Sequence, residues 1–196
     1  MFETENLSLI LRSMKFAATK HRDQRRKGKE ASPYINHPIA VAEMLHTIGG
    51  VSDVPTLVAA ILHDTIEDTD TTPDEIKREF GDEVLSIVLE VTDDKSLSKP
   101  EIIRIGLETT PNKSLAARQI KIADKISNIH DLTHTPPHKW SLERKWQYLN
   151  SSEELISRLR GTNAALERCC EEALAEGRRK LTEDSKKPVA SPNTST

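Results

Sequence analysis

The stretch ILHDTIEDT, residues 61–69, constrains the fold more than any other part of the chain. It sets four ionisable side chains into a segment whose other residues have the apolar spacing of a buried helix. On a continuous helix these four project within one arc of about 140°, and apolar side chains occupy the opposite side. Burying a carboxylate without a partner charge is costly, so the pattern predicts a cation bound at this face. The four residues are His63, Asp64, Glu67 and Asp68.

Two ligands alone hold a metal ion weakly, so further ligands are expected from other helices. His37 precedes Pro38 at an expected helix start, where its side chain is free to point into the domain. Asp124 lies in an apolar helical segment and brings a charge to a core-facing side. Each residue has an alternative role, His37 as a helix N-cap and Asp124 as a core carboxylate paired with Lys121 or Lys125.

The expected ligand set is therefore His37, His63, Asp64 and Asp124, around one divalent metal ion. Two imidazoles and two carboxylates form a borderline-to-hard site. Such a site favours Mn²⁺ over structural Zn²⁺ and leaves Fe²⁺, Co²⁺ and catalytic Zn²⁺ open.

Glu67 and Asp68 follow the expected ligands by about one helical turn. One interpretation is that they hold or deprotonate a water at the metal and manage the proton of a leaving oxygen. The other is that they simply end a helix in solvent before the turn at residues 69–71.

Helical spacing recurs along the whole chain with little β-alternation, which predicts an all-α single domain. The clearest start signal is Thr72–Pro73–Asp74–Glu75, which combines an N-cap, a proline at the first helical position and the Glu of a capping box. Residues 183–196 are rich in Ser, Thr, Pro and Lys and are expected to form a disordered tail. The expected helices span roughly residues 6–25, 38–48, 55–67, 72–80, 82–91, 100–108, 114–132, 141–149 and 152–181.

The net charge of −3 and the pI of about 6.2 give no general attraction to nucleic acid or to an anionic membrane. No apolar run approaches the roughly 18 residues of a membrane span. The only cysteines, Cys169 and Cys170, are adjacent on a helical pattern and fit a reduced setting. We therefore expect a cytoplasmic protein that binds neither nucleic acid nor membrane. Its oligomeric state stays open, a homo-oligomer included.

The order of His, His-Asp and Asp, together with the residues around it, resembles the HD superfamily of metal-dependent phosphohydrolases. A narrower resemblance is to the hydrolase domain of the RelA/SpoT alarmone family, most of all to the stand-alone small alarmone hydrolases related to the metazoan SpoT homologue. A lone HD dipeptide is a weak motif, whereas these combined motifs are specific. They are RRKGKEASPYINHP (25–38), ILHDTIEDT (61–69), VTDDKSLSK (91–99) and IKIADKISNIHDL (120–132).

The resemblance implies an HD-fold bundle of about nine or ten helices around a central metal site, formed by residues 1–182. It implies a Mn²⁺-dependent hydrolase that removes the 3′-pyrophosphate of guanosine tetraphosphate or pentaphosphate to give GDP or GTP. Glu67 would be the principal acid–base group and Asp68 its partner.

The resemblance also implies contacts to the substrate. Arg26 and Lys27 would lie on the nucleotide, although the basic segment around them has a simpler explanation as a helix end that complements the dipole. The remaining implied contacts are Lys99 and Tyr148 to phosphate, Asn128 to the sugar or its phosphate, and Tyr34 at the pocket wall.

Two rival functions fit the same fold. One is a phosphatase acting on NADPH or on nucleoside monophosphates, which would release orthophosphate rather than pyrophosphate. The other is a nucleotide-sensing module that has lost catalysis, whose mark would be erosion of the HDxxED residues. This chain retains all of them at positions 63–68.

Overall fold

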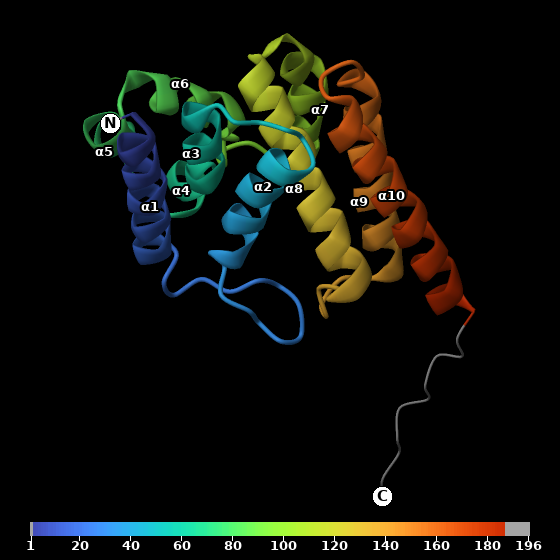
Figure 1. Cartoon of the computed structure of the whole chain (residues 1–196). Coiled ribbons are helices and arrows are strands. Elements are labelled where there is room, and N and C mark those ends of the chain that lie inside the picture. The colour runs from blue at the N-terminus through green and yellow to red at the C-terminus, as the bar shows by residue number, and fades with distance from the viewer. Residues whose placement is uncertain (1, 187–196) are drawn as a thin grey trace, which may run out of the picture.

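The structure is a computed structural model that describes residues 2–186, and the elements of this part are helices packed as one domain (Figure 1). This confirms the prediction of an all-α single domain. None of the described helices is long and apolar enough to cross a membrane. The helices are α1 (Phe2–Lys20), α2 (Asn36–Thr47), α3 (Val54–Leu62), α4 (Thr65–Asp68), α5 (Pro73–Phe80), α6 (Asp82–Val91), α7 (Lys99–Thr109), the 3₁₀ helix η1 (Thr110–Asn112), α8 (Leu115–His134), α9 (Leu142–Arg158) and α10 (Ala164–Ser185).

Helix α3 is the centre of the N-terminal half, because every residue from Thr56 to Leu62 is buried. A helix that is apolar on all sides needs neighbours on all sides, and α3 packs against α1, α2, α6 and α8. Burying each large aliphatic side chain contributes about 1.5–3 kcal/mol. Helix α8 crosses the middle of the molecule and joins this half to α9 and α10 (Figure 1).

Helix starts follow the polar caps in the sequence. The side chain of Asp53 accepts the backbone N–H of Thr56 at 3.0 Å and begins α3. The predicted capping box is confirmed at α5, where Thr72 and Glu75 each accept the other's backbone N–H. Gly81 ends α5 with a φ of 90°, a conformation that favours glycine.

The prediction of one helix over residues 55–67 is wrong, because a turn at residues 63–64 interrupts the helix between α3 and α4. Side chains take the carbonyls at this break. His63 Nδ1 lies 2.7 Å from the carbonyl oxygen of Ala60, and the Thr65 hydroxyl donates to that of Leu62 at 2.7 Å. Such local bonds compete with the helical ladder. The ligands and the two acidic residues after them therefore lie on two elements rather than on one continuous helix face.

Other helix ends also differ from the prediction. Helix α1 ends at Lys20, and residues 21–35 form a loop. Helix α9 continues past the predicted break near residue 150, and the chain turns instead at Gly161, whose φ is 82°. Helix α10 continues to Ser185, three residues into the segment predicted as a tail. Residues 187–196 of that segment lie outside the described part of the chain.

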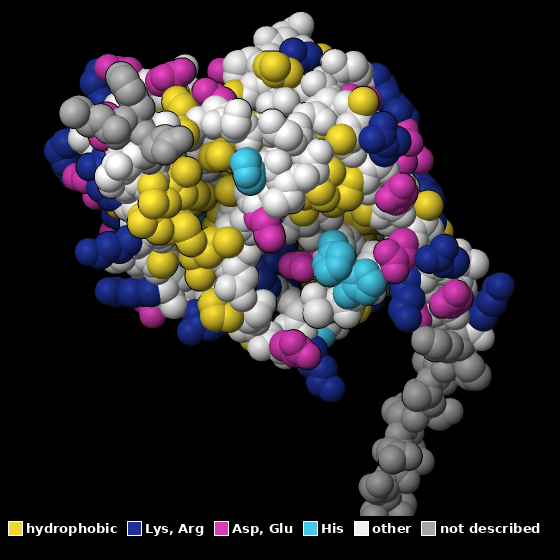
Figure 2. Space-filling model, in the orientation of Figure 1, with side chains coloured by type: hydrophobic (Ala, Val, Ile, Leu, Met, Phe, Trp, Pro, Cys, Tyr) yellow, Lys and Arg dark blue, Asp and Glu magenta, His cyan; other side chains and the backbone are white. Residues whose placement is uncertain are grey.

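Two leucines of the apolar spacing in α1 face solvent, whereas Ile10 and Met14 of the same spacing pack partly against the core. Leu7 and Leu11 are each 56% exposed, and Figure 2 shows hydrophobic side chains gathered over the region of α1 and α2. The residues that α1 buries are small, Ser13 and Ala17. Small side chains allow α1 to lie close to α3, which it contacts.

Candidate active site

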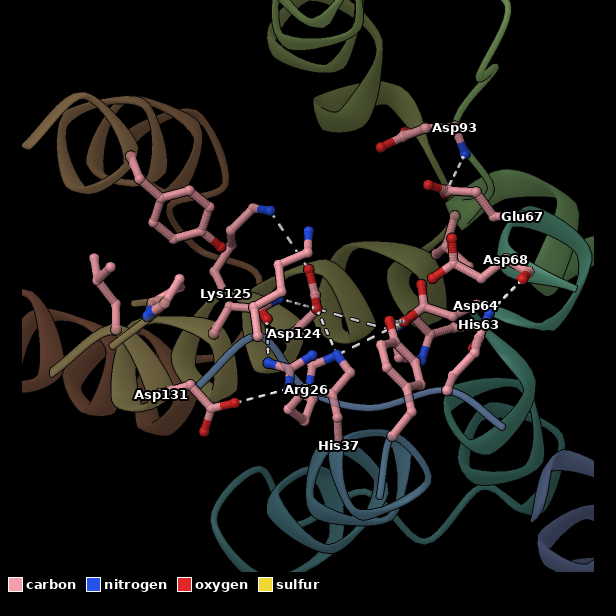
Figure 3. Close-up of a pocket in the computed structure, with 18 of the residues that line it drawn as sticks. Arg26, His37, His63, Asp64, Glu67, Asp68, Asp93, Asp124, Lys125 and Asp131 are labelled. Carbon is pink, nitrogen blue, oxygen red and sulfur yellow. Dashed lines mark hydrogen bonds and ion pairs between the residues drawn. The ribbon is translucent and has the colours of Figure 1, made fainter. Parts of the chain in front are cut away.

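A cavity of about 790 Å³ opens between the two halves of the domain and contains all of the predicted site residues in its wall. Its residues come from α2, α4, α6, α7, α8 and α9, from the turn at residues 63–64 and from the loops at residues 21–35, 92–98 and 135–141. Segments far apart in the sequence therefore meet at one place, which Figure 3 shows in close-up.

Four of these side chains converge on one point. Nε2 of His37 lies 3.1 Å from Oδ1 of Asp124 and 3.8 Å from Oδ2 of Asp64. Nε2 of His63 lies 3.1 Å from Oδ2 of Asp64 and 3.8 Å from Oδ1 of Asp124. With metal–ligand bonds of about 2.1 Å, two donors lie about 3.0 Å apart at a right angle and about 3.4 Å apart at the tetrahedral angle. The donor atoms of His37, His63 and Asp124 all lie within 4.8 Å of one another, which suits a single metal ion, and Oδ2 of Asp64 lies within 3.8 Å of both imidazoles.

The two imidazoles are oriented for this role from behind. His63 is 5% exposed, and its Nδ1–H donates to the Ala60 carbonyl, so that Nε2 carries the lone pair when the imidazole is neutral. That Nε2 is buried and makes no hydrogen bond within the described residues. Nδ1 of His37 lies 2.9 Å from the hydroxyl of Ser127. Partners of this kind fix the tautomer and direction of metal-ligating histidines, so these residues fit a metal ion.

The protonation states agree with a cation site. Burial lowers the pKa of His37 and keeps its imidazole neutral. Burial also opposes a charge on His63, but Asp64 and Asp124 outweigh it and raise the pKa of His63 to about 9. Burial disfavours the ionised form of Asp64, yet the neighbouring histidines hold its pKa below the ordinary range. The carboxylates of Asp64 and Asp124 thus attract positive charge to this point, which in the free protein is the proton of His63.

Hydrogen bonds hold the two carboxylates in place. The hydroxyl of Tyr34 donates to Oδ2 of Asp64 at 2.6 Å, and burial, followed by the charge of Asp64, raises the pKa of Tyr34 so that it remains a donor. The Asn128 amide donates to Oδ1 of Asp124 at 2.6 Å. Nζ of Lys125 lies 3.4 Å from the other oxygen of Asp124. Tyr34 and Asn128, predicted as substrate contacts, thus also orient the two carboxylates.

Arg26 extends this network. Its guanidinium donates to the Asn128 side-chain oxygen at 2.6 Å and to Asp131 at 2.8 Å. It also lies over the ring of Tyr34, 5.5 Å from the centroid. Arg26 is thus held in a fixed position at the cavity wall, close to the carboxylates (Figure 3).

Glu67 and Asp68 lie on α4, beside the cluster (Figure 3). Oε2 of Glu67 accepts the backbone N–H of Asp93 at 3.0 Å. Burial, which outweighs this bond, raises the pKa of Glu67 above its ordinary value. Asp68 forms an ion pair with Lys95. A carboxyl group with a raised pKa beside such a set of candidate metal ligands can exchange protons at neutral pH.

Lys27 and Lys99 bring positive charge to the cavity without a carboxylate partner. Burial and the nearby charge of Lys99 lower the pKa of Lys27. Neither lysine makes a side-chain hydrogen bond or ion pair within residues 2–186. Two ammonium groups placed in this way are suited to an anion with several charges.

Sequence reasoning missed several residues of the wall. Trp140 lines the cavity, with its ring 5.7 Å from that of Tyr148. The guanidinium of Arg144 lies 4.3 Å from the ring centroid of Trp140. Trp146 instead lies under the guanidinium of Arg178, at 5.7 Å. Further missed wall residues lie within the family motifs at 91–99 and 120–132, and that position is the only sequence signal for them. They include Asp93, Lys95, Lys121, Lys125 and Asp131.

Comparison with known proteins agrees with this site. The family described as "HD domain" matches residues 13–149. The guanosine-3′,5′-bis(diphosphate) 3′-pyrophosphohydrolase MESH1 of Xenopus tropicalis is 48% identical over 164 residues, which are 84% of this chain and 92% of that protein. The human MESH1 protein is 48% identical over 158 residues, 81% of this chain and 88% of its own length.

Solved structures give the same relationship. The structure of a metazoan orthologue of SpoT that hydrolyses ppGpp superposes with a TM-score of 0.84 at 40% identity, over 88% of this chain and 96% of that one. A protein of Listeria monocytogenes superposes with a TM-score of 0.60 at 27% identity, over 74% of this chain and 99% of its own. The expected HD-fold bundle is thereby confirmed. The chain belongs to the HD-domain family and, within it, to the group of stand-alone alarmone hydrolases that includes MESH1.

Proposed function

We propose that the protein removes the 3′-pyrophosphate from guanosine 3′,5′-bis(diphosphate) and from the pentaphosphate, giving GDP or GTP. The observation that carries this proposal is that Lys27 and Lys99, which form no ion pair within the described residues, share a cavity with the four proposed metal ligands. The lysines would bind the phosphate groups, and the four side chains would hold the metal ion that assists the reaction. The MESH1 relatives are named for this activity, and this chain aligns with 92% and 88% of their length. They support the same substrate.

The metal would be held by His37, His63, Asp64 and Asp124, whose donor atoms lie 3.1–3.8 Å apart in four pairs. When bound, a divalent ion supplies a Lewis acid that polarises phosphoryl oxygens and lowers the pKa of water. We propose Mn²⁺, because the donors are two imidazoles and two carboxylates and include no thiolate.

The acid–base work is assigned to Glu67, with Asp68 as its partner. Glu67 is held in one direction by the Asp93 backbone and has a pKa raised by burial. It is thus suited to take a proton from the attacking water and to pass one towards the leaving oxygen. Asp68 is on the same short helix and faces the same cavity.

Substrate binding is assigned to basic and aromatic wall residues. Lys27 and Lys99 would contact phosphate, and Arg26 would offer the face of its guanidinium to the guanine base. Asn128 would reach the sugar or its phosphate, and Tyr148 a phosphate. Tyr148 lies with its ring 5.7 Å from Nζ of Lys125. The burial of Tyr148 raises its pKa, so it would act as a neutral donor.

A cytoplasmic location, a homo-oligomeric state and the lack of nucleic-acid or membrane partners stay predictions from the sequence. The domain is assigned to residues 1–182 with a tail after it, although α10 reaches Ser185.

A substrate panel tests the proposed function. The protein is freed of metal with a chelator, checked by elemental analysis and reloaded with Mn²⁺, Zn²⁺, Fe²⁺ or Co²⁺. Each form is incubated with guanosine tetraphosphate, NADPH and nucleoside monophosphates. We expect the tetraphosphate to be hydrolysed fastest, with Mn²⁺ the best metal. Full turnover by metal-free protein, or a clear preference for NADPH or a monophosphate, would reject the proposal.

A further inference from the structure

The loop between α6 and α7, residues 92–98, contacts both carboxylates assigned to acid–base chemistry. At its base the Asp93 backbone donates to Glu67 at 3.0 Å, and further along Lys95 pairs with Oδ1 of Asp68. Dashed lines mark interactions at Glu67 and Asp68 in Figure 3. The two contacts differ in kind, because one uses the backbone and the other a long flexible side chain.

The base of this loop is fixed. Oδ1 of Asp93 lies 3.2 Å from Nζ of Lys121, whose side chain is only 14% exposed. A partly buried ion pair and a backbone hydrogen bond therefore hold Asp93 on both sides. The contact to Glu67 does not depend on Lys95.

The tip of the loop is a turn that presents Lys95 outward. The Leu97 N–H donates to the Asp94 carbonyl at 3.2 Å, and the Ser96 N–H donates to the Asp94 side chain at 2.8 Å. An aspartate at the first position stabilises such a turn through its own side chain. Lys95 occupies the second position, and its side chain is 54% exposed. It can therefore move without a change in the loop backbone.

The pair of Lys95 with Asp68 is easily exchanged. Ion pairs with an exposed partner contribute little stability, because water screens the charges. Lys95 lines the same cavity as Lys27 and Lys99. A diphosphate in that cavity would offer several charged oxygens, which form charge-assisted hydrogen bonds to an ammonium group and carry more negative charge than a single carboxylate.

We propose that Lys95 is a phosphate-binding residue that exchanges partners. In the free protein it holds Asp68, and in the complex it moves to the diphosphate of the substrate, which frees Asp68 for proton transfer. The inference rests on the proposed function, since a polyphosphate is the anion that draws Lys95 away. Binding of the diphosphate would thus free the Asp68 carboxylate for proton transfer.

Lys95→Met tests this exchange, because it keeps the length of the side chain and removes its charge. Loss of a charge-assisted contact should raise KM for guanosine tetraphosphate about tenfold or more. The value of kcat should stay within about threefold, because Asp68 is free in the complex with or without Lys95. Lys95→Arg should restore KM. Lys180→Met, at an exposed lysine of α10, is the matched control and should change neither constant.

Other results would overturn the inference. A fall in kcat with unchanged KM would mean that Lys95 stays with Asp68 as a fixed partner, and unchanged constants would mean that the pair has no role. If Lys95→Met fails to fold, Lys95→Gln takes its place. Calorimetric titration with inorganic pyrophosphate separates this inference from the proposed function. If the wild type does not hydrolyse the tetraphosphate, weaker pyrophosphate binding by Lys95→Met still supports the phosphate contact, and equal binding rejects it.

Discussion

Nε2 of His37 lies 3.1 Å from Oδ1 of Asp124, and this contact joins α2 to α8 at the proposed metal site. Ser127, one turn after Asp124 on α8, meets Nδ1 of the same imidazole at 2.9 Å. One helix thus supplies both a proposed ligand and the group that orients a second one. The geometry of the proposed metal site would therefore depend on a residue that is not itself a ligand.

Ser127→Ala should weaken metal binding about 10- to 100-fold, the usual cost of losing a partner of a ligating histidine. The buried imidazole of His37 would lose the acceptor of its Nδ1–H and with it a fixed direction. Metal affinity is measured by competition with a chelator. Ser157→Ala, which removes an exposed hydroxyl bonded to the Glu154 carbonyl, is the control and should bind metal normally. Equal affinities in both variants would contradict the assigned role of Ser127.

Glu67→Gln should lower kcat by roughly 10²–10⁴, the scale of general acid–base catalysis, and should leave metal content and substrate affinity near wild type. The amide keeps an oxygen that can accept the Asp93 N–H, so the local structure is retained. Steady-state kinetics, metal analysis and a binding titration are measured on the same preparation. Turnover at the wild-type rate would move the acid–base role to Asp68.

Activity should depend on the ionisation of Glu67. A base must be ionised to accept a proton, and burial raises the pKa of Glu67, so its ionised fraction is lost at a higher pH than for an ordinary Glu. The ratio kcat/KM should therefore fall as the pH is lowered through this raised pKa and level off above it. The low residual rate of Glu67→Gln should lack this fall. Metal content is determined at each pH, and a rate that rises on acidification would contradict the assignment.

Lys27→Ala should raise KM for the tetraphosphate more than it lowers kcat, because a phosphate contact is present in both the ground state and the transition state. Within the part of the chain that the structure describes, Lys27 has no carboxylate partner to leave uncompensated, so its removal should not destabilise the fold. Thermal unfolding checks this point. A fall in kcat at constant KM would show that Lys27 acts only in the transition state.

His63, Asp64 and Asp124 could be proposed as metal ligands from the sequence because they place ionisable groups among apolar residues, where only a strong partner makes them tolerable. His37 could be predicted from its place at a helix start. The motifs around all four also resemble those of a known family. Burial and charge at these positions leave few other interpretations.

The break after Leu62 could not be predicted, because helical spacing continues through it. The break is made by the Thr65 hydroxyl and the His63 ring, which bond to nearby carbonyls. The exposed leucines of α1, Leu7 and Leu11, show a similar limit of prediction from apolar spacing. Apolar spacing predicts a helix, whereas the packing of α1 on α3 is decided by small residues such as Ala17.

The pairing of charges across the cavity was also beyond the sequence. Arg26 meets Asp131, and Lys95 meets Asp68, only because separate loops and helices end at the same place. A basic residue in a motif can be recognised as a substrate contact, but its partner in the free protein depends on the tertiary structure. The exchange proposed for Lys95 is therefore an inference from the structure alone.

In the proposed reaction the 3′-diphosphate leaves as one unit, and phosphorus NMR of the reaction tests this most directly. Metal-loaded protein is mixed with guanosine tetraphosphate, and the phosphorus signals are followed until the substrate is consumed. We expect GDP and pyrophosphate to appear together in equal amounts, with no orthophosphate. Release of orthophosphate, or a substrate that persists unchanged beside fully metal-loaded protein, would contradict it.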